Sequence, residues 1–289
     1  MSVLGRVLLM NVLLLLACIN LQAQVNIPRI SPDAKLEQMI GLTKVEVKYS
    51  RPSKRGRQIL GEIIPYDRIW RVGANESTKV SFSTDVVVAG NPLKAGTYAL
   101  YAFPHQENWE VVFHQDTTHW GDGRDAYNPE MDALRFTVQP KVLNDLVETF
   151  RIDFQGFTHT SATMVWQWEH FQIDFRISVD TDPMVMDDIH YQIDHNPTAV
   201  TYYEAAKYMQ ERNKKHGMAL TWLEEAERLE GPKYYIYRVR ALVLGQMHWY
   251  KEAIAAAEVS AKLAEEEGKD EFVRLAEGYI EEWQKLIQH

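Results

Sequence analysis

The spacing of hydrophobic residues changes once along this chain, at Asp182-Pro183, and that change constrains the fold more than any other feature. In residues 43–179, apolar and polar residues alternate within short segments, as at Val45, Val47 and Tyr49. Such alternation is typical of strands, in which successive side chains point to opposite faces. After Pro183, apolar residues recur with the spacing of one face of a helix. The sequence therefore predicts a β-rich part followed by an all-helical part.

About ten segments of the first part have strand-like patterns, and turn residues such as Gly90-Asn91-Pro92 and Asn128-Pro129 separate them. The clearest segments are residues 97–103, 109–114, 134–138, 149–154, 162–168 and 171–179. Short strands at this spacing are typical of an antiparallel β-sandwich of the jelly-roll or immunoglobulin-like kind. We therefore expect a β-sandwich domain over residues 30–180.

The second part begins with a helix-start signal, because Asp182 suits the N-cap and Pro183 the first helical position. Gly231-Pro232 and Gly268 interrupt the helical pattern. The predicted helices are residues 183–192, 198–213, 217–230, 232–246, 249–267 and 270–288. We therefore expect a helical domain over residues 183–289.

An internal repeat of 34 residues runs through these helices. The matching pairs are Tyr203 and Tyr237, Ala219 and Ala253, Leu220 and Ile254, Leu223 and Ala257, and Ala226 and Ser260. This is the tetratricopeptide period, and small residues at such positions let paired helices approach closely. About two units fit, with departures at Arg240 and Gly231-Pro232. In this register Ala255 faces outward, and the helical grooves could take a protein partner. An ordinary helical bundle with a coincident spacing is the alternative.

The first 23 residues have the composition of a secretion signal. Residues 8–19 form an apolar run that is too short to span a bilayer comfortably. Leu21-Gln22-Ala23 favours cleavage before Gln24, whereas Leu15-Leu16-Ala17-Cys18 resembles a lipobox in which Cys18 is lipidated. We therefore expect an exported protein, periplasmic or associated with the outer membrane, with a lipid anchor as the alternative to simple cleavage. No other segment is apolar enough to span a membrane.

Composition excludes several kinds of chemistry. Cys18 is the only cysteine, so cleavage after Ala23 would leave no disulfide, catalytic thiol or cysteine metal ligand. The formal net charge is −9, and the chain has no cluster of lysine or arginine. This acidic balance argues against nucleic acid and anionic membrane surfaces as partners. The 289 residues, 46% of them hydrophobic, suffice for one or two cores.

The segment 56–78 concentrates polar side chains among glycines, between two predicted strands. These side chains are Arg57, Arg71, Asn75, Glu76 and Thr78. In a functional site, Arg71 could bind a carboxylate or phosphate, Glu76 could act as a general base, and Asn75 could orient a substrate. In a structural corner, Arg71 would instead pair with Glu76, and Asn75 would satisfy turn amides. Both interpretations remain open at this stage.

Two further groups of residues could carry a site. His114, Asp116 and His119 are weak candidates for a metal site, because imidazole and carboxylate together suit zinc or another divalent ion. A polar strand end is the alternative. The tryptophans of the first part are Trp70, Trp109, Trp120, Trp166 and Trp168. They could stack on a sugar or form core, and Trp166 and Trp168 share one face of a predicted strand.

The first part also resembles a family of secreted bacterial proteins known only as a domain of unknown function, DUF2911. The matching elements are Ser31-Pro32, Ile40-Gly41-Leu42-Thr43, Tyr49-Ser50-Arg51-Pro52, Gly56-Arg57, Gly61, Pro65-Tyr66, residues 70–78, Ala95-Gly96-Thr97-Tyr98, Pro104, Trp109, Trp120-Gly121 and residues 166–169. The resemblance implies a single β-sandwich, often followed by helices, and no known activity. One departure is His114, where the family pattern usually has asparagine.

No motif of a known enzyme class stands out. The Gly-x-Ser-x-Gly elbow, the phosphate loop, the dinucleotide fingerprint and His-Glu-x-x-His are all missing, and no cofactor is expected. Ser77 has no histidine near it in the sequence. We expect a non-catalytic module that binds a small molecule, a sugar or a protein. The alternatives are a hydrolase-type enzyme centred on Arg57, Arg71, Asn75 and Glu76, and a purely structural envelope component.

Overall fold

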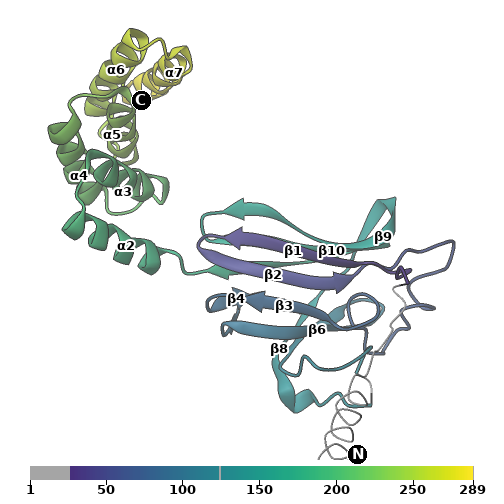
Figure 1. Ribbon diagram of the computed structural model, residues 1–289. Coiled ribbons are helices and arrows are strands. Elements are labelled where there is room, and N and C mark those ends of the chain that lie inside the picture. Colours follow the sequence, from purple (N-terminus) through teal and green to yellow (C-terminus); the bar gives the residue numbers. More distant parts are fainter. Residues whose placement is uncertain (1–26, 124, 289) are drawn as a thin grey trace, which may run out of the picture. The chain divides into compact units, whose positions relative to one another are not determined.

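The computed structural model describes residues 27–123 and 125–288. The predicted signal over residues 1–23 and the lipidation candidate Cys18 therefore lie outside the described residues. The chain divides into two compact units, Met1–Val179 and Asp180–His289. Within the described ranges, no helix has both the length and the apolar character needed to cross a membrane. Figure 1 shows both units, with the strands in the first and the helices in the second.

The first unit consists of two antiparallel sheets that share one core, which confirms the predicted sandwich. One sheet has six strands in the order β1-β2-β3-β6-β7-β8 (Figure 1). They are β1 (Asp33–Ile40), β2 (Thr43–Ser50), β3 (Thr78–Phe82), β6 (Gly96–Pro104), β7 (Trp109–His114) and β8 (Asp132–Val138). The other sheet has four strands in the order β5-β4-β10-β9. They are β4 (Val86–Val88), β5 (Asn91–Leu93), β9 (Lys141–Thr158) and β10 (Ser161–Val179).

Strand β10 covers two segments that the sequence predicts as separate strands. The alternation of apolar residues breaks at Glu169, where the pairing of β10 with β9 shifts its register. Glu169 has a φ of 49°, as expected of an irregular residue at a bulge. Its carboxylate pairs with Lys54 at 2.8 Å and accepts a hydrogen bond from the backbone of Ile59 at 3.3 Å. The bulge therefore anchors the loop that follows β2.

Aromatic side chains from both sheets fill the middle of the sandwich. Trp70 stacks on Trp168 with ring centroids 6.3 Å apart and meets Trp109 edge-on at 6.0 Å. Trp166 is 0% exposed and Trp168 is 1% exposed, so of the two interpretations that the sequence left open, core and sugar-stacking platform, the structure shows core. Both indoles lie in the core because the face of β10 that carries them packs against the six-stranded sheet. Trp120, in contrast, is 68% exposed.

The second unit contains six helices, as the sequence predicts. They are α2 (Asp182–His195), α3 (Ala199–Glu211), α4 (His216–Glu230), α5 (Tyr234–Gln246), α6 (Tyr250–Glu266) and α7 (Asp270–Ile287). The prediction of Asp182 as the N-cap is wrong by one residue, because Thr181 holds that position. Asp182 lies in the first turn and pairs with Arg212 at 2.9 Å and Lys214 at 2.6 Å. These tertiary contacts replace the capping hydrogen bond.

Burial follows the 34-residue repeat closely. In each matching pair the two residues are buried to the same degree. Both residues are buried in the pairs of Ala219, Leu223 and Ala226, and both are half-buried in the pairs of Tyr203 and Leu220. Ala219 on α4 and Ala253 on α6 are fully buried, whereas Ala255 is exposed. The predicted register, with Ala255 outward, is therefore confirmed. Small side chains allow the close helix contacts that a repeat of this kind needs.

Candidate functional site

The loop between Trp70 and Thr78 has an unusual backbone that several contacts hold in place. Val72, Gly73 and Asn75 have φ values of 52°, 151° and 58°. A β-branched residue at positive φ is strained, so Val72 needs support from its surroundings. Thr78 Oγ1 donates to the Val72 carbonyl oxygen at 2.6 Å, and Trp70 Nε1 donates to that of Gly73 at 3.2 Å. These contacts hold the loop in one conformation, so the backbone at Arg71 is fixed in place.

Asn75 and Thr78, both predicted as ligand contacts, form hydrogen bonds within the protein that hold this loop in place. The Asn75 Nδ2 group donates to the Ser31 carbonyl oxygen and to Ser50 Oγ, both at 3.1 Å. Asparagine also tolerates positive φ better than most residues. Thr78 is fully buried. The side chain of Asn75 thus ties the segment before β1 to the end of β2.

Arg71 lines a hollow of about 300 Å³, which we call the arginine pocket. It is defined by Arg57, Arg68, Arg71 and Asp122, with apolar walls from Ile63, Pro65 and Trp70. The Nε of Arg71 is buried and has no hydrogen-bond partner among the described residues. Burial lowers the pKa of Arg71, and the nearby Asp122 carboxylate opposes that shift. The buried side of this guanidinium is therefore incompletely satisfied by the protein.

Arg57 reaches the same pocket from the loop after β2. Its Nε donates to the Lys54 carbonyl oxygen at 3.0 Å, and its Nη2 donates to that of Ser53 at 2.8 Å. The loop itself pairs with β9, since Lys54 donates its backbone N–H to Glu148 at 2.8 Å. Two internal hydrogen bonds thus orient Arg57 while the remaining N–H groups of its guanidinium face outward. The structure brings Arg57 and Arg71, both predicted as site residues, to one pocket.

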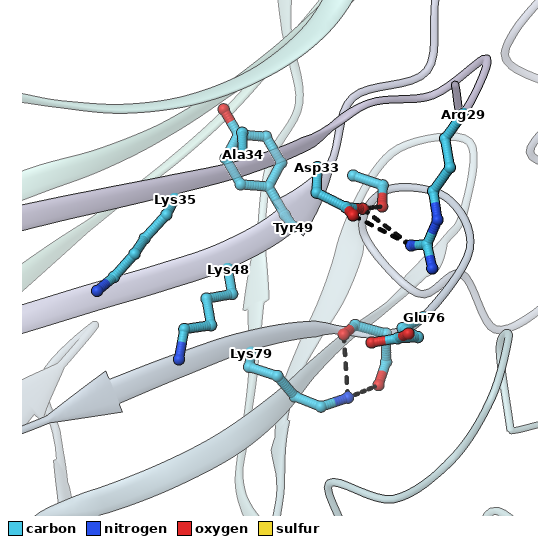
Figure 2. Close-up of a pocket in the computed structure, with 10 residues that line it drawn as sticks. Arg29, Asp33, Ala34, Lys35, Lys48, Tyr49, Glu76 and Lys79 are labelled. Carbon is cyan, nitrogen blue, oxygen red and sulfur yellow. Dashed lines mark hydrogen bonds and ion pairs between the residues drawn. The ribbon is translucent and has the colours of Figure 1, made fainter. Parts of the chain in front are cut away.

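Glu76 lies elsewhere. It is exposed and lines a second hollow of about 440 Å³, beside the outer faces of β1, β2 and β3 (Figure 2). We call this hollow the lysine pocket, and its polar lining is Arg29, Asp33, Lys35, Lys48, Ser50, Glu76, Ser77 and Lys79. Within the described ranges, no ion pair joins Glu76 to Arg71, so the predicted buried pair is wrong. The intervening turn at Asn75 sends the two side chains to different sides of the loop.

Most cations of the lysine pocket already have carboxylate partners. Lys35 and Lys48 both pair with Glu46, each at 2.8 Å, and Arg29 pairs with Asp33 at 3.1 Å. Hydrogen bonds from Lys35 and Lys48 lower the pKa of Glu46 to about 2. Lys79 differs from these cations, because its Nζ is hydrogen-bonded to the carbonyl oxygen of Ser77 at 3.0 Å and to Ser77 Oγ.

The histidine candidates do not converge as metal ligands. His114 Nδ1 contacts Asp132 Oδ1 at 2.9 Å, whereas His119 Nε2 contacts Asp116 Oδ2 at 3.2 Å. The two imidazole rings lie 5.7 Å apart, and each has its own carboxylate partner. In the described part of the chain, no group of three or more histidines and carboxylates could hold a metal ion.

Sequence reasoning missed several members of both pockets. Arg68 stands three residues before Arg71, a spacing that could have indicated it. Ser77 and Lys79 are two residues apart, so their placement on one face of a strand could also have been expected. The proximity of Lys35, Lys48 and Lys79 could not have been expected from the sequence, because it depends on the register of three strands. Lys35 lies opposite Lys48, and Lys48 lies opposite Lys79.

Comparison with known proteins identifies the family of the chain but no activity. A family model described as "Protein of unknown function (DUF2911)" matches residues 31–177. This range covers both pockets except Arg29. No curated protein and no solved structure matches the chain.

Proposed function

Because the chain belongs to the DUF2911 family, whose function is unknown, we propose a function from its own residues: the β-sandwich binds a small organic anion in the arginine pocket. The observation that carries this proposal is the buried Nε of Arg71, which has no partner in the described part of the chain. A buried donor left unsatisfied costs about 1–3 kcal/mol. Among the described residues, no carboxylate forms an ion pair with Arg71, so an anion in the pocket would supply the acceptors that this guanidinium lacks.

The charges of the pocket favour a negative ligand. Its described lining contains three arginines and one aspartate, which gives a formal charge of +2. Guanidinium groups bind carboxylates and phosphates through two parallel hydrogen bonds. Lowering of the Arg71 pKa does not deprotonate the group, because the ordinary pKa of arginine lies far above neutral pH. Arg71 therefore remains a cation that an anion can neutralise.

The size and walls of the pocket favour an organic anion over a bare inorganic one. A volume of about 300 Å³ is at the lower end of the range for small-molecule sites. Ile63, Pro65 and Trp70 add apolar surface next to the guanidinium groups. A short dicarboxylate or a small phosphate ester would use both the charge and this surface.

The loop that carries Arg71 supports the same function. Strained residues persist where the surroundings hold them, and such residues cluster at sites. Val72 is held at positive φ by the Thr78 hydroxyl, directly after Arg71. A preformed site loses less conformational entropy when a ligand binds.

Calorimetric titration tests the proposal with three probes: succinate, phenyl phosphate and inorganic phosphate. We expect binding of at least one organic probe. Arg71→Lys keeps the charge but removes the planar fork, so it should weaken binding about tenfold or more. Arg151→Gln is the matched control, because Arg151 is an exposed arginine outside the pocket that bonds to Gln167. Lack of binding by all three probes, or equal affinity in Arg71→Lys, would contradict the proposal.

We also propose that the chain is exported. This proposal is supported by the composition of residues 1–23, with cleavage before Gln24 or lipidation at Cys18 as the two processing routes. A protein partner on the helical unit stays a prediction.

A further inference from the structure

The lysine pocket contains a serine and a lysine in direct contact, an arrangement that the anion site does not use. Ser77 immediately precedes β3, and Lys79 lies on it, two residues further along the same face. Both line the pocket, and Lys79 Nζ is hydrogen-bonded to Ser77 Oγ. Figure 2 shows the Lys79 side chain extending toward the end of β3 where Glu76 lies.

The environment of Lys79 favours the neutral amine more than the environments of the other cations of this pocket do. Among the described residues, Arg29, Lys35 and Lys48 each form an ion pair with a carboxylate, and Lys79 forms none. Lys79 is half-buried, and burial lowers its pKa, although the charges of Glu76 and Asp116 oppose the shift. A lysine with a lowered pKa has a larger neutral fraction at any given pH, which favours it as a proton acceptor.

We propose that Ser77 is a nucleophile and Lys79 its general base, in a site that hydrolyses short, polar esters. This activity is independent of the anion binding proposed for the arginine pocket. The arrangement has the essential requirement of an activated nucleophile, which is a hydroxyl in hydrogen-bond contact with a base.

The reaction proceeds in two balanced steps. Ser77 Oγ attacks the ester carbonyl carbon, and its proton passes to the neutral amine of Lys79. The bond from the carbonyl carbon to the alcohol oxygen then breaks, and the Lys79 ammonium returns the proton to the departing alcohol. In the second step a water molecule attacks the acyl–Ser77 ester and gives a proton to Lys79. The acid leaves, and the proton restores the Ser77 hydroxyl.

Tyr101 is the positioning residue behind this pair. It is fully buried, and burial raises its pKa, an effect that a hydrogen bond from Ser77 opposes. Its hydroxyl lies 3.3 Å from His119 Nδ1, and His119 in turn contacts Asp116 at 3.2 Å. This chain of contacts holds the Tyr101 hydroxyl in place, where it accepts from Ser77 until the serine turns its proton toward Lys79.

The lining of the pocket sets the substrate class. Arg29 and Lys48 lie on the same walls as the carboxylates of Asp33 and Glu76. Among the described lining residues, apolar surface comes from Ala34, from Tyr49 and from the stems of the lysines. Such a surface favours a short acyl group with polar substituents over a long hydrocarbon chain. The probe series should therefore include an acetyl and an octanoyl ester.

The test uses the proposed exported form of the chain, residues 24–289, and a fluorophosphonate probe. The probe forms a P–O bond to an activated serine and releases fluoride. We expect covalent addition at Ser77, located by peptide mass spectrometry, at a rate that rises with pH as Lys79 becomes neutral. Hydrolysis of p-nitrophenyl acetate should be faster than that of the octanoate.

Two variants distinguish the base from a structural role. Lys79→Arg keeps the positive charge and the hydrogen-bond donors but stays protonated, so labelling should slow about 100-fold or more. Ser81→Ala is the control, because Ser81 lies two residues beyond Lys79 and bonds to Thr97 at 2.8 Å. It should label like the wild type. Ser77→Ala should lose labelling yet keep succinate or phenyl phosphate binding, which separates this proposal from the anion site. Absence of label at Ser77 in the folded wild type, or unchanged labelling in Lys79→Arg, would overturn it.

Discussion

Arg71 and Glu76 are five residues apart, yet their side chains line different pockets. The segment before β1 runs between the two, because Arg29 and Asp33 line one pocket and Ser31 the other. Asn75 holds this segment through its bond to the Ser31 carbonyl oxygen. Asn75 therefore holds in place a segment that contributes to both pockets, which the sequence alone had suggested as one candidate site.

Replacing Asn75 should be costly for stability, whereas replacing Glu76 should not. Asn75→Ala removes two hydrogen bonds and leaves an alanine at positive φ, which should lower the free energy of unfolding by about 2–4 kcal/mol. Glu76→Gln is the control, because Glu76 is exposed, and it should change stability by about 0.5 kcal/mol or less. Urea unfolding measures both. Equal losses would show that the corner does not depend on Asn75.

Gly73 should be the least replaceable glycine near the site. A Cβ at this position would lie 2.9 Å from the Ser50 carbonyl oxygen, and φ is 151°. Gly73→Ala should therefore destabilise by about 2–5 kcal/mol. Gly56→Ala has positive φ but no atom within 4 Å, so it should cost only about 1–2 kcal/mol. Thermal melts compare the pair, and a Gly73→Ala melt at or above that of Gly56→Ala would contradict the described packing.

The helical repeat makes a prediction that depends on register. Ala253→Leu should overpack the contact between helices and cost about 1–3 kcal/mol, because Ala253 is fully buried. Ala255→Leu should be nearly neutral, since Ala255 is exposed. Hydrogen exchange of the α5 and α6 amides in the full chain measures the difference. Similar loss of protection in both variants would mean that the 34-residue register does not describe the packing.

The lowered pKa of Glu46 predicts how the stability of the protein depends on pH. Its pKa is lowered from 4.5 to about 2 by hydrogen bonds from Lys35 and Lys48. A carboxylate with a lowered pKa stabilises the folded state above its unfolded pKa, and that contribution is lost as the pH falls through the folded pKa. Wild type should therefore lose its advantage over Glu46→Gln between pH 4.5 and about pH 2. Denaturant unfolding across this window measures the difference, and a constant gap would exclude the proposed pairing.

Processing of the N-terminus is directly measurable. Mass spectrometry of the exported protein should find a chain that begins at Gln24, or at a lipid-modified Cys18. The two products differ by the lipid mass and by residues 18–23, so one spectrum distinguishes them. An exported protein that retains residues 1–16 would contradict the secretion signal.

The change of hydrophobic period was enough to predict the sandwich and the six helices, because local patterning decides which faces are buried. It failed where a tertiary contact decided the outcome. At Glu169 a bulge lets one long strand continue through a break in alternation. At Asp182 pairing with Arg212 replaced capping.

The sequence was enough to indicate which segment carries the candidate site, but not which side chains come together there. Arg57 and Arg71 meet because the loop after β2 crosses to β9, and nothing in the local sequence specifies that crossing. The contact of Ser77 with Lys79 needs only the two-residue period of a strand. Burial of Lys79, on which the proposed chemistry depends, is set by how the surrounding segments pack.

The crossing of the loop to β9 has a consequence for solubility. β9 is the outermost strand of its sheet, and an outermost strand with free N–H and C=O groups can recruit a strand from another molecule. Here the carbonyl oxygens of Pro52 and Glu148 accept from Phe150 and Lys54, at 2.9 and 2.8 Å. Proline also offers no N–H to an incoming strand. The same loop that brings Arg57 to its pocket therefore shields part of this strand from intermolecular β-pairing, and variants that loosen it should aggregate before they unfold.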